Sequence, residues 1–243
     1  MFYNAAERFS MSGAVMNLLR VLVTLALLFS FVMTAVAVDK KSFGKTKDGH
    51  EVLLYTLKNK NGMEVVITNF GGDVISIKAP DRDGKFADVA LGFDSLSNYE
   101  KQGPYFGAII GRYGNRLANG KFSLNGKTYQ VPQNDGTNAL HGGKVGFDKR
   151  VWEAKESSDA QGQHLHLHYL SPDGEEGFPG NLNVDVTYTL TDTSGKTHFV
   201  RQFDYPSRTV LFAVVNTLVL RARIINESET AVSQLRMVLE SRP

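Results

Sequence analysis

The sequence predicts an all-β fold, either a sandwich or a barrel, from three observations. Short segments such as residues 64–68, 164–170 and 182–190 are rich in β-branched and aromatic residues or alternate between apolar and polar ones. Turn clusters containing Gly, Asn, Asp and Pro separate these segments. No long stretch repeats with the 3.6-residue period of a helix. Strands of this kind pack into sheets that bury one face.

The elements after residue 38 are expected to be short. Residues 64–68 and 74–78 are predicted strands joined by a turn at 69–73, and a second turn follows the later strand. The remaining expectations, in chain order, are a strand at 88–92, one helical turn at 96–102, an apolar segment at 106–110, strands at 164–170 and 182–190, an apolar run at 210–220, a strand at 217–225 and a short terminal helix at 233–240.

The strongest local signal is a β-hairpin centred on Asn125 and Gly126. Asn-Gly suits a two-residue type I′ turn because both central residues need positive φ. In that register Phe122 faces Tyr129 across the strands, which predicts an aromatic pair on one face. The hairpin would also return the chain, so that the two ends of the stretch 111–143 lie near each other.

Composition excludes several functional classes. The chain has 243 residues, which is enough for one domain with a substantial core. Its formal net charge of +2 gives no support to a nucleic-acid partner. Because it contains no cysteine, disulfides, thiolate nucleophiles and cysteine-based zinc sites are excluded together.

The N-terminus is predicted to be a secretory signal peptide. Arg20 precedes an apolar run at 21–33, and the small residues Ala35 and Ala37 form a cleavage pattern. A membrane span needs about 20 apolar residues. Extending the run to Val38 gives 18 residues, so an uncleaved anchor is the alternative.

These signals predict a secreted protein with three parts: a signal peptide at 1–37, a β-sandwich domain at 38–190, and a divergent C-terminal tail at 191–243. No stable membrane span is expected after cleavage. In a secreted chain the sequon at Asn226 would be usable for an N-glycan.

Three alternating histidines, His164, His166 and His168, raise a metal hypothesis. Alternate residues of a strand share a face about 7 Å apart, so two of the three could bind one Zn²⁺. The alternative is a half-exposed strand with Leu165 and Leu167 turned inward. No carboxylate at a suitable sequence spacing completes a ligand set, so we predict no metal site. The acidic loop at residues 171–180 likewise fails the calcium-loop pattern.

The remaining candidate chemistry lies in Arg112, Asn115, Arg116 and His141. Arg supplies a planar fork of donors, Asn both donors and acceptors, and His a group that titrates near neutrality. These groups suit the hydroxyls of a sugar. The alternative is a structural network between arginine side chains and the backbone.

Six ordered sequence blocks resemble the aldose 1-epimerase family, also called galactose mutarotases; they lie at residues 69–72, 111–116, 120–126, 140–143, 146–152 and 171–180. The resemblance implies a β-supersandwich fold. It also implies interconversion of the α and β anomers of hexoses such as galactose and glucose, without a cofactor. Asn115, Arg116 and His141 match the family's substrate-binding positions. Arg112 matches a motif position and is assigned no substrate role.

The sequence departs from the family after residue 190. The family's second active-site histidine, the expected general acid, lies in a Thr-Asn-His-Ser-Tyr-Phe-Asn-Leu-like segment that is missing here. His198 lacks that surrounding pattern. The family's general-base Glu and sugar-binding Asp would lie beyond residue 243, and Glu240 does not match the motif of either. We therefore name no catalytic residue, and we expect an incomplete sandwich.

Two functions follow from the resemblance. One is an isomerase of hexose anomers, whose turnover the missing acid and base put in question. The other is a carbohydrate-binding remnant without catalysis. A third reading is a truncated product with no function. A relative that acts on phosphorylated hexoses is a further alternative, which a secreted location argues against. A mis-spliced transcript between residues 190 and 217 would explain the divergent tail.

Overall fold

The structure is a computed structural model that describes residues 37–101, 103–193 and 196–204. This part of the chain is built mainly of antiparallel strands, so the all-β prediction is confirmed. The strands are β1 (Asp39–Lys45), β2 (Glu51–Lys58), β3 (Glu64–Thr68), β4 (Val74–Pro80), β5 (Phe86–Asp88), β6 (Arg116–Leu117), β7 (Lys121–Leu124), β8 (Lys127–Gln130), β9 (Ala139–Leu140), β10 (Glu153–Ser158), β11 (Gly162–Ser171), β12 (Leu182–Thr193) and β13 (Lys196–Asp204). The helical pieces are α2 (Leu96–Tyr99) and three 3₁₀ turns at Ala118–Gly120, Phe147–Lys149 and Glu175–Gly177.

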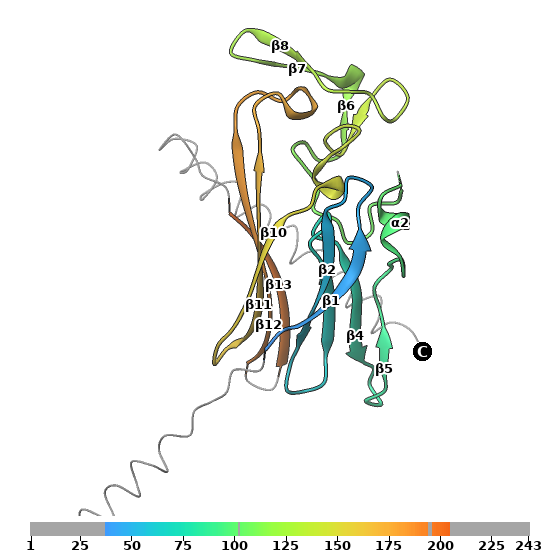
Figure 1. The fold of residues 1–243 in the computed structure, drawn as a ribbon, viewed down its shortest axis with the longest axis vertical. Helices are drawn as coiled ribbons and strands as arrows, with labels where there is room; N and C mark the ends of the chain where they lie inside the picture. Colours follow the sequence, from blue (N-terminus) through green and yellow to red (C-terminus); the bar gives the residue numbers. More distant parts are fainter. Residues whose placement is uncertain (1–36, 102, 194–195, 205–243) are drawn as a thin grey trace, which may run out of the picture. The chain divides into compact units, whose positions relative to one another are not determined.

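Two sheets pack face to face (Figure 1). One has the order β1-β2-β3-β4-β5, and the other has the order β10-β11-β12-β13. The hydrophobic core lies between them and contains the buried side chains of Tyr55, Leu57, Val65, Ile67, Trp152, Leu165, Leu167, Val184, Val186, Tyr188 and Leu190, among others. Burial of this apolar surface is the main term that stabilises the sandwich.

Strand β11 shows how the sequence pattern directs the packing. Leu165 and Leu167 are fully buried in the core, as their alternation with histidines predicts. They pair with Tyr188 and Val186 of β12, which are also fully buried. The strand is therefore buried on one face only, and its histidines lie on the other.

The predicted hairpin is present as β7 and β8. Asn125 and Gly126 have φ values of 52° and 76°, as the turn requires. Phe122 pairs with Tyr129, and their ring centroids are 5.3 Å apart. Phe122 also stacks on Phe178 at 5.6 Å, which joins the hairpin to the loop at residues 171–180.

The turn at residues 69–73 joins the two sheets. The hydroxyl of Tyr188, on β12, donates a hydrogen bond of 2.6 Å to the carbonyl oxygen of Gly72. The backbone N–H of Trp152 donates to the Asn69 carbonyl at 2.8 Å, and that of Ile109 to the Gly71 carbonyl at 2.9 Å. Gly72 has a φ of 60°, and a Cβ there would come within 2.2 Å of Ile109. The positive φ and this close approach both favour glycine at the crossing point.

Two boundaries differ from the sequence expectation. The strand expected at 182–190 is β12, which continues to Thr193, and β13 continues the sheet by pairing with β12. The strand expected at 88–92 is instead β5, which ends at Asp88. Its carboxylate accepts the N–H groups of Ile77 and Ala90, both at 3.0 Å, and the backbone N–H of Val89 makes one further bond to the Ile77 carbonyl at 2.9 Å. The exposed residues that follow do not continue the sheet.

Several expectations fall outside the described residues. These are the signal peptide up to residue 36, the apolar run at 210–220, the strand at 217–225, the sequon at Asn226 and the helix at 233–240. Within the part of the chain that the structure describes, no helix has both the length and the apolar character of a membrane span.

Asp73 is a buried carboxyl group in the turn that joins the sheets, and it is 3% exposed. Burial raises its pKa well above the usual value; Lys149 and Arg201 oppose this effect and Asp148 adds to it. The folded state therefore holds this proton more tightly than the unfolded state does. By linkage, the free energy of unfolding falls as pH rises above about 4, the ordinary pKa of an aspartate.

Asp73→Asn should stabilise the fold at neutral pH, because the amide never ionises. The gain should shrink as pH falls from 7 toward about 4, because below that pH the wild-type carboxyl is protonated in both states. Urea unfolding at pH 7 and at pH 4 measures this difference, with the exposed Asp83→Asn as control. An equal effect at both pH values would contradict the assignment.

Candidate functional site

The two ends of the stretch 111–143 meet in a two-stranded sheet. Strand β6 pairs antiparallel with β9, and Arg116 lies opposite Leu140. The backbone N–H of His141 donates to the carbonyl of Asn115 at 3.0 Å. The structure thus brings together all three residues that the resemblance marks as substrate-binding: Asn115, Arg116 and His141. Asn115 and Arg116 are exposed and His141 is half-buried. We define these three residues as the polar wall.

One hydrogen bond of His141 determines which ring nitrogen carries the proton of the neutral ring. The backbone N–H of Asn115 donates to Nδ1 of His141 at 3.0 Å. Since a backbone N–H can only donate, Nδ1 must be the acceptor and the proton of the neutral ring sits on Nε2. His141 therefore offers an N–H donor at Nε2. This is the tautomer that a sugar oxygen can use.

A second contact restrains the imidazole plane. The ring of Tyr105 meets that of His141 edge to face, with centroids 4.7 Å apart and planes at 72°. The ammonium of Lys149 lies 5.9 Å from the centroid of Tyr105. Sequence reasoning missed Tyr105, because it precedes the motif and reaches His141 only through tertiary packing.

Arg116 is held by a carboxylate of the returning chain. Its Nε donates to Oδ2 of Asp135 at 2.7 Å. The Asn115 side chain accepts the backbone N–H of Arg116 at 2.9 Å. Sequence reasoning also missed Asp135. Its position shortly before β9 could have indicated a contact with Arg116, once the two ends of the stretch 111–143 were expected to meet.

Arg112, in contrast to Arg116, bonds the protein through its whole guanidinium group. Its Nε donates to Oγ of Ser171 at 2.7 Å. The Nη1 group donates to the carbonyls of Pro179 and Gly180 at 3.1 and 2.8 Å. The Nη2 group donates to those of Ser171 and Pro172 at 2.9 and 2.8 Å. All five donors of this guanidinium are engaged, so it ties the 111–116 segment to the loop at 171–180.

The loop at residues 171–180 is itself anchored by two carboxylates. Glu175 accepts hydrogen bonds from the hydroxyls of Tyr169 and Ser171, and it pairs with Arg150 at 2.9 Å. Glu176 accepts the backbone N–H of Lys144 at 2.7 Å. The clamp around Arg112 therefore rests on a fixed loop.

Gly142 allows the backbone of the His141 loop to lie against that of the arginine segment. It has a φ of 99°, and a Cβ there would be 1.8 Å from the carbonyl oxygen of Gly111. No side chain fits in that space. The side chain of Asn134 completes the support by bonding the backbone of Leu140 and Gly143 at 2.6 to 3.0 Å.

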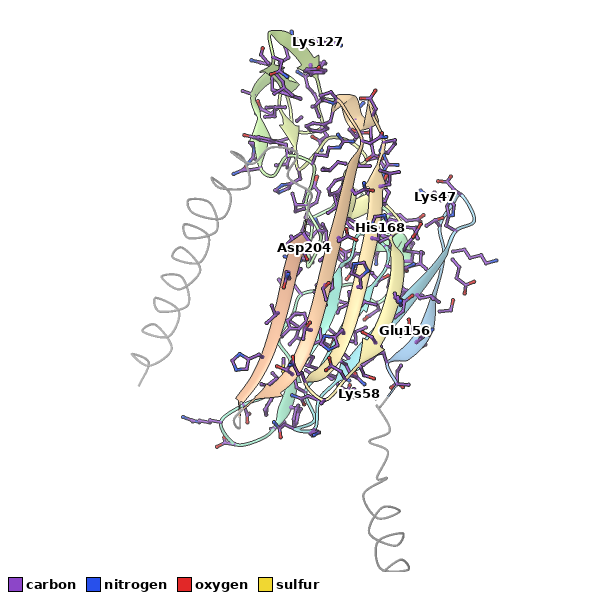
Figure 2. The ribbon with its side chains drawn as sticks, turned by 90° about the vertical axis from the view of Figure 1, so that its left-hand side faces the viewer. Lys47, Lys58, Lys127, Glu156, His168 and Asp204 are labelled. Atoms are coloured by element: carbon purple, nitrogen blue, oxygen red, sulfur yellow. The ribbon has the colours of Figure 1, made fainter. Side chains whose placement is uncertain are left out.

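The three alternating histidines lie elsewhere, on the outer face of the sheet β10–β13, where Figure 2 labels His168. The carboxylate of Asp185, on β12, lies 3.2 Å from Nε2 of His166 and 2.8 Å from Nδ1 of His168. Sequence spacing missed this carboxylate because it comes from the neighbouring strand. Within the described residues, no group of three or more His, Cys, Asp or Glu is arranged to hold a metal ion.

The fold and the polar wall together define a class: an antiparallel two-sheet sandwich that displays guanidinium, amide and imidazole groups, which can hydrogen-bond hydroxyl groups. The family model for aldose 1-epimerase matches residues 53–210. This chain therefore belongs to the aldose 1-epimerase family.

Individual relatives agree with this. The galactose mutarotase of Sus scrofa is 41% identical over 155 residues, which are 64% of this chain and 44% of that protein. The aldose 1-epimerase of Escherichia coli (strain K12) is 41% identical over 145 residues, covering 60% of this chain and 41% of that protein. This chain thus spans less than half the length of these relatives.

Solved structures give the same result for the fold. The galactose 1-epimerase of Lactobacillus acidophilus NCFM has a TM-score of 0.59 and 26% identity, over 70% of this chain and 49% of that chain. The aldose epimerase homologue of C. elegans has a TM-score of 0.52 and 27% identity, over 64% of this chain and 51% of that chain. The fold expected from the resemblance therefore matches about half of each solved structure.

Arg112→Lys should destabilise the fold by about 2–3 kcal/mol, because a single ammonium cannot reach the hydroxyl and four carbonyls that the guanidinium bonds. Urea unfolding monitored by circular dichroism measures the loss. Arg82→Lys is the matched control, since that side chain is 93% exposed. Equal stability of the two variants would show that the Arg112 network carries little energy.

Proposed function

We propose that this chain binds an aldohexose at Asn115, Arg116 and His141 and acts in the interconversion of the α and β anomers of hexoses such as galactose and glucose. Membership of the aldose 1-epimerase family supports this proposal. The single observation that carries it is the tautomer of His141, whose Nε2–H is left as a donor on the same wall as the Arg116 guanidinium.

The reaction explains why these groups are needed. Opening a pyranose breaks the bond between the anomeric carbon and the ring oxygen. A base takes the proton of the anomeric hydroxyl, and an acid protonates the ring oxygen. The open aldehyde then recloses on either face, and the protons return. His141 at Nε2 would donate a hydrogen bond near the ring oxygen, while Asn115 and Arg116 hold hydroxyls in position. No step requires a cofactor.

A second candidate is sugar binding without turnover. The observation that favours it concerns the carboxylates described around the wall. Asp135 is bound to Arg116, Glu175 to Arg150, Tyr169 and Ser171, and Glu176 to the backbone of Lys144. Each of these three carboxylates already has a protein partner, so none stands ready as a general base.

Calorimetric titration with galactose and with glucose tests binding, and polarimetry of freshly dissolved α-glucose tests turnover. His141→Gln should weaken sugar binding about tenfold, the loss expected when a positioned donor is removed. His50→Gln, on the β1–β2 connection, is the control. Anomer interconversion faster than the spontaneous rate supports the first candidate, binding alone supports the second, and no binding to either sugar overturns both.

We also propose that the protein is secreted after cleavage near Val38. The pattern at residues 20–37 supports this, and Val38 is 6% exposed in the core immediately before β1. A cleaved chain would thus begin with a residue that the sandwich already holds. Expression in a secreting eukaryotic host followed by N-terminal sequencing should give a first residue near Val38, and a secreted chain beginning at Met1 would refute the cleavage.

A further inference from the structure

The contact between Arg116 and Asp135 differs from an ordinary surface ion pair in its backbone support. The N–H of Asp135 donates to the carbonyl of Asn138 at 3.1 Å, and the N–H of Asn138 returns to the carbonyl of Asp135 at 3.0 Å. The preceding residue, Asn134, bonds the backbone of Leu140 through its side chain. The carboxylate of Asp135 is therefore presented by a closed turn, and less conformational entropy is lost when it meets Arg116.

The nitrogen of Arg116 that bonds Asp135 determines which of its N–H donors remain available to a ligand. Asp135 is bonded to Nε, at 2.7 Å, and Arg116 remains 57% exposed along its side chain. Within the described residues no hydrogen bond engages its terminal nitrogens, whereas those of Arg112 end on backbone carbonyls. A guanidinium fixed at Nε presents its terminal pair as a planar fork.

The same carboxylate also balances the charge of the polar wall. Arg116 has its counter-charge in Asp135, and Lys149, which lies behind Tyr105, has one in Asp148 at 2.8 Å. A wall compensated in this way attracts a neutral sugar through hydrogen bonds and gives no net attraction to a phosphate.

Resting on the proposed function, we propose that Asp135 is a positioning and specificity-determining residue of the sugar site. It fixes the Arg116 guanidinium at Nε, and it cancels the arginine charge, so that loss of its own charge admits anionic sugars.

The test uses the full chain and three variants. Asp135→Asn removes the charge, Asp135→Glu keeps it, and Asp39→Asn breaks a comparable exposed pair, that between Lys58 and Asp39 at 2.9 Å. Calorimetry measures binding of galactose and of galactose 6-phosphate. Proton–nitrogen NMR follows the Nε–H signal of Arg116, which is assigned by its loss in Arg116→Lys and does not depend on any sugar.

In Asp135→Asn, galactose affinity should fall about twofold to fivefold, the usual range for one exposed ion pair. Affinity for galactose 6-phosphate should rise about threefold or more at low salt and lose this gain at high salt. The Nε–H signal should broaden or disappear through exchange with water. Asp135→Glu should restore all three readouts, and Asp39→Asn should change none.

Each other outcome is decisive. An unchanged Nε–H signal in Asp135→Asn overturns the positioning role, and an unchanged ratio of the two sugar affinities overturns the specificity role. If wild type binds no sugar while the Nε–H signal still depends on Asp135, the proposed function and the specificity role fail, and the clamp on Arg116 stands.

Discussion

The guanidinium of Arg112 is the interaction on which the candidate site depends. It bonds one hydroxyl and four carbonyls of the loop at residues 171–180, and that loop is anchored by Glu175 to the strand that carries Tyr169. Asn115 and Arg116 follow within four residues. Their position relative to the core is therefore set by a side chain that itself never needs to meet a ligand. A structural arginine at position 112 thus supports Arg116, the arginine that we propose binds the sugar.

The sequence predicted best where a signal is local. Asn125-Gly126 specified a turn of known geometry, and the alternation around Leu165 specified a strand with one buried face. Strand β13 was not predicted from the sequence because its inward face includes Arg201, which breaks the apolar alternation. The guanidinium is accommodated at the carbonyls of Gly107 and Ala108, 3.2 and 3.4 Å away. No local sequence pattern predicts that these two carbonyls accept hydrogen bonds from Arg201.

The sequence predicted the three residues of the polar wall, but it did not predict the neighbouring side chains that hold them. The family motifs mark Asn115, Arg116 and His141. The roles of Tyr105 and Asp135 depend on where two strands of only two residues each, β6 and β9, happen to pair. Such short strands have no periodicity to read. The contacts that select the imidazole tautomer and orient the guanidinium are thus properties of the folded backbone.

Gly142 gives this wall an evolutionary consequence. Where two main chains touch directly, as Gly142 and Gly111 do, there is no side chain whose exchange could move one segment slightly relative to the other. A substitution at Gly142 would force the two segments of the polar wall apart. Small, stepwise changes in their relative position are therefore not available to selection. Diversification of ligand preference among related proteins would then be confined to the outermost side chains. The backbone beneath them would keep one conformation while the exposed side chains vary.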